Sequence, residues 1–162
     1  NVFVSDIDGE FALSVPNATM RPAIVSGSSG LKAQAWHWSY LRHGAPQLNG
    51  RFERMSNRRM KSKDWAAWIS IKTIVESVLR IQDISGKNII KYLKGVDLQV
   101  DGSKGIGLNF KQPTNQLRQT ILLVSSNDWT TALAPLEEFK DSENNLNTLG
   151  ISKNQTECKI EE

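Results

Sequence analysis

The sequence predicts a mixed α/β fold that ends in a ribbon of antiparallel strands. Two short runs of β-branched and aromatic residues lie near the start of the chain. The middle of the chain carries apolar residues at three- and four-residue spacing, which indicates helices. Short apolar runs separated by turn residues follow, which indicates strands joined by tight turns. This order of strands, helices and antiparallel strands is typical of an α/β lobe.

The two strands predicted near the start are separated by a loop that carries acidic residues. Residues 2–4 (Val-Phe-Val) predict a buried strand, and residues 23–25 predict a second one. Asp6 and Asp8 follow the first strand, at the position where open α/β sheets bind ligands. Because a buried strand needs neighbours on both edges and the chain offers few strands, we expect it to be the C-terminal part of a larger protein.

Three helices are predicted in the middle of the chain. Residues 47–57 form the first, and residues 86–94 form a short one that begins after Ser85 and ends before Gly95. Residues 63–80 form the clearest helix, with Ser62 as the candidate N-cap and Asp64 in the first turn. Its spacing predicts one buried stripe, made of Trp65, Trp68, Ile71, Val75, Val78 and Leu79.

The pattern then changes to strands and ends in a polar tail. Residues 98–100, 107–111, 117–125 and 129–134 predict strands, with turns at residues 113–115 and 126–128. Few apolar residues follow residue 137. We therefore divide the chain into a partial lobe at residues 1–136 and a polar tail at residues 137–162.

The composition excludes some classes of function. No apolar run approaches the roughly 20 residues that span a bilayer. Positive charge gathers in one stretch, which would suit an anionic ligand or a nucleic acid. No recognition motif accompanies it, so we expect a solvated surface and no nucleic-acid binding. The stretch contains Arg51, Arg54, Arg58, Arg59, Lys61 and Lys63.

The candidate chemistry points to binding and not to an enzyme. The two histidines, His37 and His43, lack metal-type spacing to further ligands, and no nucleophile is paired with a base. Trp36, His37 and Trp38 are adjacent, so they cannot all face one way, and some of these rings must be exposed or line a cleft. The residues alone therefore predict a binding lobe with an acidic loop and an aromatic patch.

An ordered set of motifs along the chain resembles a known family. The motifs are VFVSDIDGEF at residues 2–11, AWH at 35–37, GAPQLNGRF at 44–52, RM at 59–60, DWAAW at 64–68, GLNF at 107–110, NQLRQ at 115–119 and LNTLG at 146–150. Together they resemble the ABC-transporter substrate-binding proteins associated with alcohol oxidation that depends on pyrroloquinoline quinone (PQQ). This group is related to the branched-chain amino-acid binding proteins. The resemblance extends over about residues 2–158.

The resemblance implies a type I periplasmic binding fold, in which two α/β lobes close on a ligand at a hinge. This chain would form most of the second, C-terminal lobe and the terminal antiparallel crossover strands. Strands within residues 117–134 would then cross toward the other lobe and leave apolar side chains at an open edge. These side chains are Ile121, Leu122, Leu123 and Leu133.

The resemblance also implies a role as the solute-binding component of an ABC import system in the periplasm. Its expected partners are a small-molecule ligand, the transporter permease and a quinoprotein dehydrogenase, with no catalytic activity, resident cofactor or bound metal. PQQ, an amino acid and an organic acid all remain open as ligands. The acidic residues favour an ammonium group, whereas the aromatic rings with Arg118 or Lys32 favour a flat carboxylate. The predicted ligand-binding residues are Asp6, Asp8, Trp36, His37, Trp38 and Arg118.

Two other functions fit the residues. The first is an accessory or chaperone protein that docks on a quinoprotein dehydrogenase and carries no ligand. The second is the sensor domain of a receptor, which the absence of a membrane segment after Glu162 disfavours.

Overall fold

The computed structural model describes residues 1–6, 11–12, 14–27, 31–112, 114–125, 128–136 and 145–151. Three α-helices and eight strands lie in these segments, so the mixed α/β class predicted from the sequence is confirmed. In chain order the elements are β1 (Val2–Val4), a 3-10 turn (Val15–Asn17), β2 (Val25–Gly27), β3 (Lys32–Gln34), α1 (Ala45–Ser56), α2 (Ser62–Ile81), α3 (Gly86–Leu93), β4 (Val100–Asp101), β5 (Gly107–Lys111), β6 (Gln116–Arg118), β7 (Ile121–Val124), β8 (Thr130–Ala134) and a second 3-10 turn (Asn145–Thr148).

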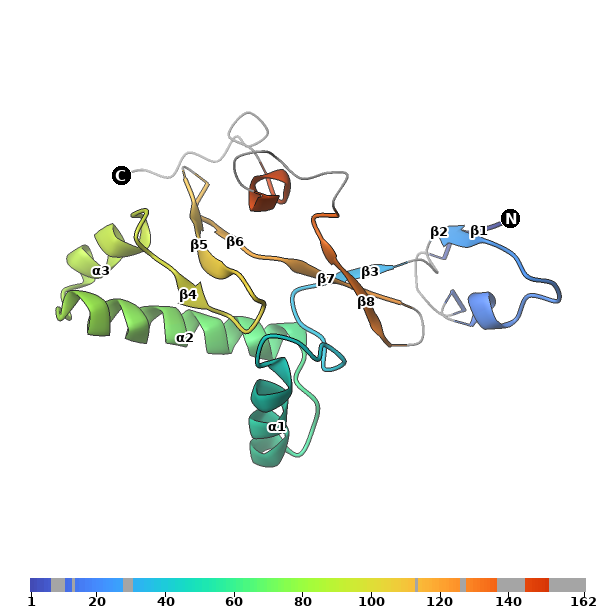
Figure 1. Cartoon of the computed structure of the whole chain (residues 1–162), viewed down its shortest axis with the longest axis horizontal. Coiled ribbons are helices and arrows are strands. Elements are labelled where there is room, and N and C mark those ends of the chain that lie inside the picture. The colour runs from blue at the N-terminus through green and yellow to red at the C-terminus, as the bar shows by residue number, and fades with distance from the viewer. Residues whose placement is uncertain are drawn as a thin grey trace.

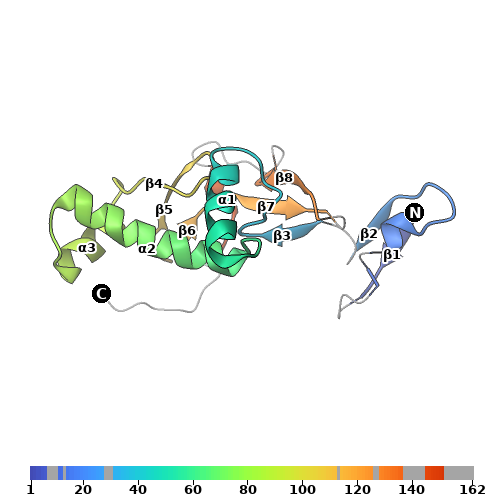
Figure 2. The ribbon, with the colours of Figure 1, turned by 90° about the horizontal axis from the view of Figure 1, so that it is seen from below.

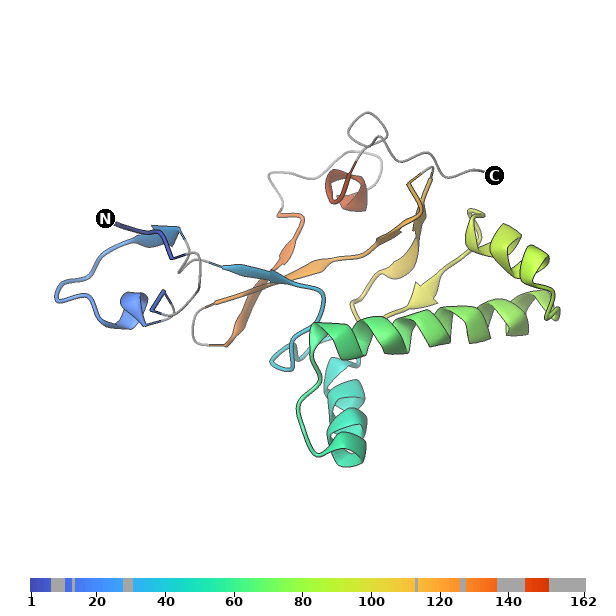
Figure 3. The ribbon, with the colours of Figure 1, turned by 180° about the vertical axis from the view of Figure 1, so that it is seen from behind.

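The described strands form three small sheets. β4, β5 and β6 make one antiparallel sheet, and β3, β7 and β8 make another, with β7 in its centre. β1 and β2 pair in parallel and form a separate two-stranded sheet. Figures 1 and 3 show this pair at one end of an elongated molecule, while α2 and α3 lie at the other end. The two antiparallel sheets lie between these ends, and α1 stands crosswise near the start of α2 (Figure 2).

A single hydrophobic core joins the helices to both antiparallel sheets. The rings of Trp36 and Trp65 stack in its centre, with centroids 6.0 Å apart and planes inclined by 6°. Both side chains are almost fully buried, and apolar residues from every layer surround them. The other buried members are Tyr40, Ala45, Met60, Ile69, Leu98, Val100, Leu108, Leu122 and Val124.

The long helix α2 begins one residue earlier than the sequence suggests. Ser62 was the candidate N-cap, but it is the first helical residue, and Lys61 occupies the cap position. The Ser62 hydroxyl instead donates to the Trp36 carbonyl oxygen at 3.0 Å, which ties the helix to the core. The first turn is closed by Asp64, whose carboxylate accepts the Lys61 backbone N–H at 2.9 Å.

The buried face of α2 is not the one that the spacing predicts. Of the predicted stripe, Trp65 is buried, but Ile71, Val75 and Leu79 are 64%, 49% and 68% exposed. The face that packs on β4 and α3 contains Trp65, Ile69, Thr73 and Ser77. The two hydroxyl groups can be buried because they donate to carbonyl oxygens four residues earlier, each at 2.7 Å. The more apolar face of α2 is therefore left without a cover by the described residues.

A strand lies near every predicted run, but β2 and β4 begin two residues later than predicted, and one omission changes the topology. β1 and β5 have the predicted bounds, whereas the predicted strand at residues 117–125 divides into β6 and β7 at Gln119 and Thr120. The omitted strand is β3, whose sequence Lys-Ala-Gln has no apolar alternation. Because β3 pairs with β7, the expected open edge is wrong for the residues of β7, and Leu122 is fully buried, whereas Leu133 lies on the edge strand β8. Ile121, Leu123 and Leu133 are partly buried.

Asp64 gives a first stability prediction. Its carboxylate also pairs with both terminal nitrogens of Arg58, each at 2.7 Å. These hydrogen bonds lower its pKa to about 2. We expect Asp64→Asn to lower the free energy of unfolding by about 1 kcal/mol at pH 7, because the amide oxygen can still accept the Lys61 N–H but the charge that pairs with Arg58 and favours the helix N-terminus is lost. The carboxylate is stabilising above its unfolded pKa, so the difference should vanish as the pH falls from about 4 to about 2.

Urea unfolding at pH 7 and pH 2.5 tests the Asp64 prediction. Asp97→Asn is the matched control, because Asp97 is exposed and its carboxylate closes no helix. Equal effects of the two substitutions at pH 7 would contradict the stabilising role of the Asp64 charge.

Candidate functional site

The predicted aromatic run is divided between the core and the surface. Trp36 is fully buried, stacks on Trp65 and donates its indole N–H to the Asn49 side-chain oxygen at 2.9 Å. Its ring is therefore covered by protein and does not face a cavity. His37 and Trp38 lie on the other side of this turn, and both line a pocket. The geometric expectation that neighbouring rings must face different ways is confirmed.

His37 is held in the pocket wall by hydrogen bonds. Its Nδ1 accepts the Ser39 backbone N–H at 3.3 Å and lies 2.8 Å from the Ser39 hydroxyl. Because Nδ1 is an acceptor, the proton of the neutral ring is on Nε2. Burial lowers the pKa of His37, an effect that Arg59 strengthens and Asp128 opposes. The ring is thus neutral near pH 7 and offers one N–H donor.

The basic stretch of the sequence folds over Trp38 and His37. The guanidinium group of Arg59 lies 3.6 Å from the centre of the Trp38 ring, within the range of a cation–π contact. This contact forms one wall of a pocket of about 850 Å³. Residues 58–64, which comprise the segment before α2 and the first turn of α2, supply most of the lining. The pocket is lined by Gln34, His37, Trp38, Arg58, Arg59, Met60, Lys61, Ser62, Lys63, Asp64 and Asp128.

The pocket carries an excess of positive charge. Its lining contains four permanent cations and two carboxylates. One carboxylate, that of Asp64, is already paired with Arg58. No carboxylate of the described residues lies within ion-pair distance of Arg59, Lys61 or Lys63. Arg59, Lys61 and Lys63 thus line the pocket together with the Trp38 ring, an arrangement that suits a flat anion. We name it the basic-aromatic pocket.

The other predicted binding residues lie away from the basic-aromatic pocket. The Asp6 carboxylate accepts the backbone N–H groups of Phe11 and Ala12, at 3.0 and 2.8 Å, and so closes its own loop beside β1. Asp6 follows β1, which lies at the β1–β2 end of the molecule (Figure 1). Asp8 lies outside the described residues. Of the predicted acidic pair, the described residue Asp6 is therefore not brought next to the aromatic rings.

Arg118 makes hydrogen bonds that stabilise the fold. Its Nε donates to the Asn147 side-chain oxygen at 2.9 Å, and a terminal nitrogen donates to that of Asn109 at 3.1 Å. These bonds hold the 3-10 turn at Asn145–Thr148 against β5 and β6. Lys32, the other cation proposed for a carboxylate, is exposed on β3. Of the predicted binding residues that the structure describes, only His37 and Trp38 thus line one pocket together.

The cations of the pocket were visible in the sequence, but their location was not. The basic stretch stood out as the main excess of positive charge, and it was interpreted as solvated surface. The contact of this stretch with Trp38 joins a segment that precedes α1 in the chain to one that follows it. No local sequence pattern predicts such a contact. The available signal was the coincidence of unpaired cations with an aromatic run that could not be entirely buried.

Other classes of site find no support among the described residues. They contain no group of three or more His, Cys, Asp or Glu side chains that could hold a metal ion. None of their helices is long and apolar enough to cross a membrane. The chain matches no protein-family model, no curated protein and no solved structure in the comparisons made. The geometry of the basic-aromatic pocket is therefore the main structural evidence for function.

Proposed function

We propose that this chain is a noncatalytic binding lobe whose basic-aromatic pocket binds a small, flat anion. The observation that carries the proposal is the Arg59 guanidinium stacked on Trp38, next to the unpaired ammonium groups of Lys61 and Lys63. A planar carboxylate ligand would gain charge-assisted hydrogen bonds from the cations. Its aromatic body would stack on the outer face of the Arg59 guanidinium, whose inner face lies on Trp38.

Among the ligands that the resemblance implies, the pocket favours PQQ or an organic acid over an amino acid. PQQ is a flat tricarboxylate, and its charge is opposite to that of the pocket. An amino acid carries an ammonium group, which the unpaired cations would repel. Asp6, the described carboxylate expected to hold an ammonium group, makes hydrogen bonds within its own loop instead.

The wider biological role follows the sequence resemblance and is part of this proposal. The intact protein would serve in the periplasm as the solute-binding component of an ABC importer, and it would deliver its ligand to the permease. A type I binding fold would supply a second lobe that closes over the ligand. The β1–β2 pair is compatible with such an arrangement, because parallel strands are usually covered on both faces and an isolated pair is marginally stable.

Calorimetric titration of the chain with PQQ tests the proposed ligand class. We expect saturable binding that Arg59→Gln weakens about tenfold to a hundredfold, since a hydrogen bond to a charged group contributes about 1.5–3 kcal/mol. Arg54→Gln is the matched control, because Arg54 belongs to the same basic stretch but does not line this pocket. Absence of binding by PQQ, citrate and succinate, or equal effects of the two substitutions, would contradict the proposal.

The exposed apolar face of α2 favours a second candidate function, that of an accessory protein. Ile71, Ile74, Val75 and Leu79 are between 47% and 68% exposed on this face. An apolar patch of this kind is typical of a protein–protein interface. The partner would be a quinoprotein dehydrogenase. Stable co-purification with the dehydrogenase, lost in Ile71→Lys and combined with no anion binding, would favour this function over the solute-binding one.

A further inference from the structure

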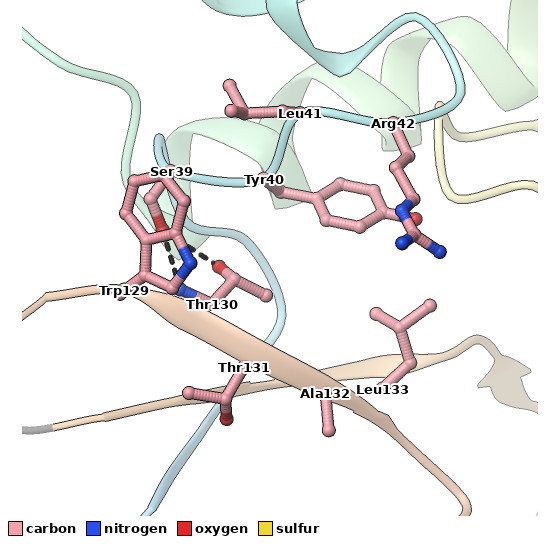
Figure 4. Close-up of a pocket in the computed structure, with 9 residues that line it drawn as sticks. All are labelled: Ser39, Tyr40, Leu41, Arg42, Trp129, Thr130, Thr131, Ala132 and Leu133. Atoms are coloured by element: carbon pink, nitrogen blue, oxygen red, sulfur yellow. Dashed lines mark hydrogen bonds between the residues drawn. The ribbon is translucent and has the colours of Figure 1, made fainter.

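A second cavity lies on the other side of the Ser39 turn from the basic-aromatic pocket. It has a volume of about 450 Å³ and opens between the loop at residues 39–42 and strand β8. Figure 4 shows its walls, with the loop above and the strand below. This size is within the range of cavities that hold small organic ligands. The lining residues are Ser39, Tyr40, Leu41, Arg42, Trp129, Thr130, Thr131, Ala132 and Leu133.

The Tyr40 side chain brings a buried hydroxyl group without a partner to this cavity. Tyr40 is 4% exposed, and its hydroxyl oxygen has no hydrogen-bond partner. Its ring is fixed from two sides, by the edge of Trp36 and by His43, with centroids 6.3 Å away in both cases. Burial raises the pKa of the phenol, so the group stays protonated and can donate. Buried polar groups nearly always have a partner in folded proteins, which makes this hydroxyl unusual.

A cation without a carboxylate partner accompanies the hydroxyl group. Arg42 is exposed, and no carboxylate of the described residues lies within ion-pair distance of it. Its charge acts on Tyr40, because it opposes the effect of burial on the pKa of the phenol. Figure 4 shows the guanidinium group at the hydroxyl end of the Tyr40 ring, above Leu133. A hydroxyl donor beside a guanidinium group is suited to a carboxylate.

The other polar side-chain groups of the cavity are already hydrogen-bonded, apart from the Trp129 indole N–H. The Trp129 indole is 50% exposed and stands at the opposite end from Arg42 (Figure 4). The Ser39 and Thr130 hydroxyl groups lie 2.9 Å apart, and the Ser39 oxygen also accepts the Thr130 backbone N–H at 2.8 Å. These two side chains therefore satisfy each other. Among the lining side chains, the donors left for a polar ligand are Tyr40, Arg42 and, at the other end, the Trp129 indole N–H.

We infer that this cavity binds a small monocarboxylate with an apolar or aromatic body. The carboxylate accepts from the Tyr40 hydroxyl and the Arg42 guanidinium. The body lies along β8 and extends toward the exposed ring of Trp129. This site is separate from the basic-aromatic pocket, because none of its lining residues belongs to that pocket. It does not depend on the function proposed above.

Titration of the full chain with phenylacetate tests the site, with binding followed by calorimetry and by the indole signals in NMR spectra. We expect a Kd of about 1 mM or tighter, which corresponds to a small fragment with one charged anchor. Phenylacetamide has the same shape without the charge, and it should bind at least tenfold more weakly. Arg42→Gln should weaken phenylacetate binding at least tenfold, and Tyr40→Phe should also weaken it.

Two controls separate this site from the basic-aromatic pocket and from a loss of folding. Arg59→Gln should leave phenylacetate binding unchanged, and Arg42→Gln should leave PQQ binding unchanged. Tyr40→Phe without ligand should unfold at the same or a higher temperature, because it removes a buried group that lacks a partner. The inference is overturned if phenylacetate does not bind saturably. It is also overturned if phenylacetamide binds equally well, or if both Arg42→Gln and Tyr40→Phe leave the affinity unchanged.

Discussion

Trp65→Ala is expected to lower the free energy of unfolding by about 3–5 kcal/mol, the usual cost of removing a buried tryptophan. Trp65 is 1% exposed, and it stacks on Trp36 in the centre of the core. Its indole N–H donates to the Gly102 carbonyl oxygen at 3.0 Å, which would be left buried without this partner. The substitution therefore leaves a cavity at the junction of α2 with the strand β4.

Chemical unfolding in urea measures this loss. Trp129→Ala is the matched control, since Trp129 is half exposed and should cost less than about 1 kcal/mol. Trp65→Phe is a milder variant that keeps an aromatic ring but lacks the indole N–H, and it serves if Trp65→Ala does not fold. If Trp65→Ala and Trp129→Ala cost the same, Trp65 is not the centre of the core.

The stability of the protein is expected to rise by up to about 3 kcal/mol between pH 7 and pH 10 because of one buried lysine. Lys104 is 1% exposed, and its ammonium group has no carboxylate partner among the described residues. Its Nζ donates hydrogen bonds to the Gln119 side-chain oxygen at 2.6 Å and to the Thr120 carbonyl oxygen at 2.9 Å. Burial lowers its pKa from 10.5 to about 7.

The sign of this pH dependence follows from the number of protons that the folded and unfolded states bind. Between pH 7 and pH 10.5 the unfolded chain keeps a proton on Lys104 that the folded chain has lost, so the free energy of unfolding increases with pH. Below pH 7 both states are protonated, and the contribution is constant. The Trp65 ring, whose centre is 3.9 Å from Nζ, favours the charged amine and reduces the slope.

Urea unfolding from pH 6 to pH 10 in wild type and Lys104→Met measures the slope. The wild-type curve should rise and the variant curve should be flatter over this range. Measurements stop at pH 10, because the raised pKa of Tyr40 acts in the opposite direction above it. Lys72→Met is the control, since the Lys72 ammonium group is partly exposed and pairs with Glu76 at 3.3 Å. Parallel curves for wild type and Lys104→Met would contradict the prediction.

Sequence patterns located the helices well because the signals for helices are local. The capping residues and the glycine after α3 directly flank the helices, and the three- and four-residue spacing lies within them. The same patterns selected the wrong face of α2, since spacing shows that an apolar stripe exists but not what covers it. The structure buries Thr73 and Ser77, whose hydroxyl groups are satisfied within the helix, and leaves Ile71 and Leu79 exposed.

The strands show the same limit. β5 was predicted with its observed bounds, but β3 carries a sequence that is polar in character and forms only because β7 offers it a partner. Strand pairing joins distant segments, so a single sequence indicates which runs prefer extended structure and not which of them meet. The missed pairing reversed the expectation about Leu122, which is central and buried instead of lying at an open edge.

By itself, the sequence determined the mixed α/β class, the three helices and the fact that the rings of Trp36, His37 and Trp38 could not all be buried. Only the tertiary structure decided that Trp36 belongs to the core while Trp38 faces the basic stretch under Arg59. It also brought Tyr40 and Arg42 to the cavity beside β8. The physical reason is the range of the interactions. Helix signals act over a few residues, whereas a binding pocket is made by side chains that meet only when distant segments pack together.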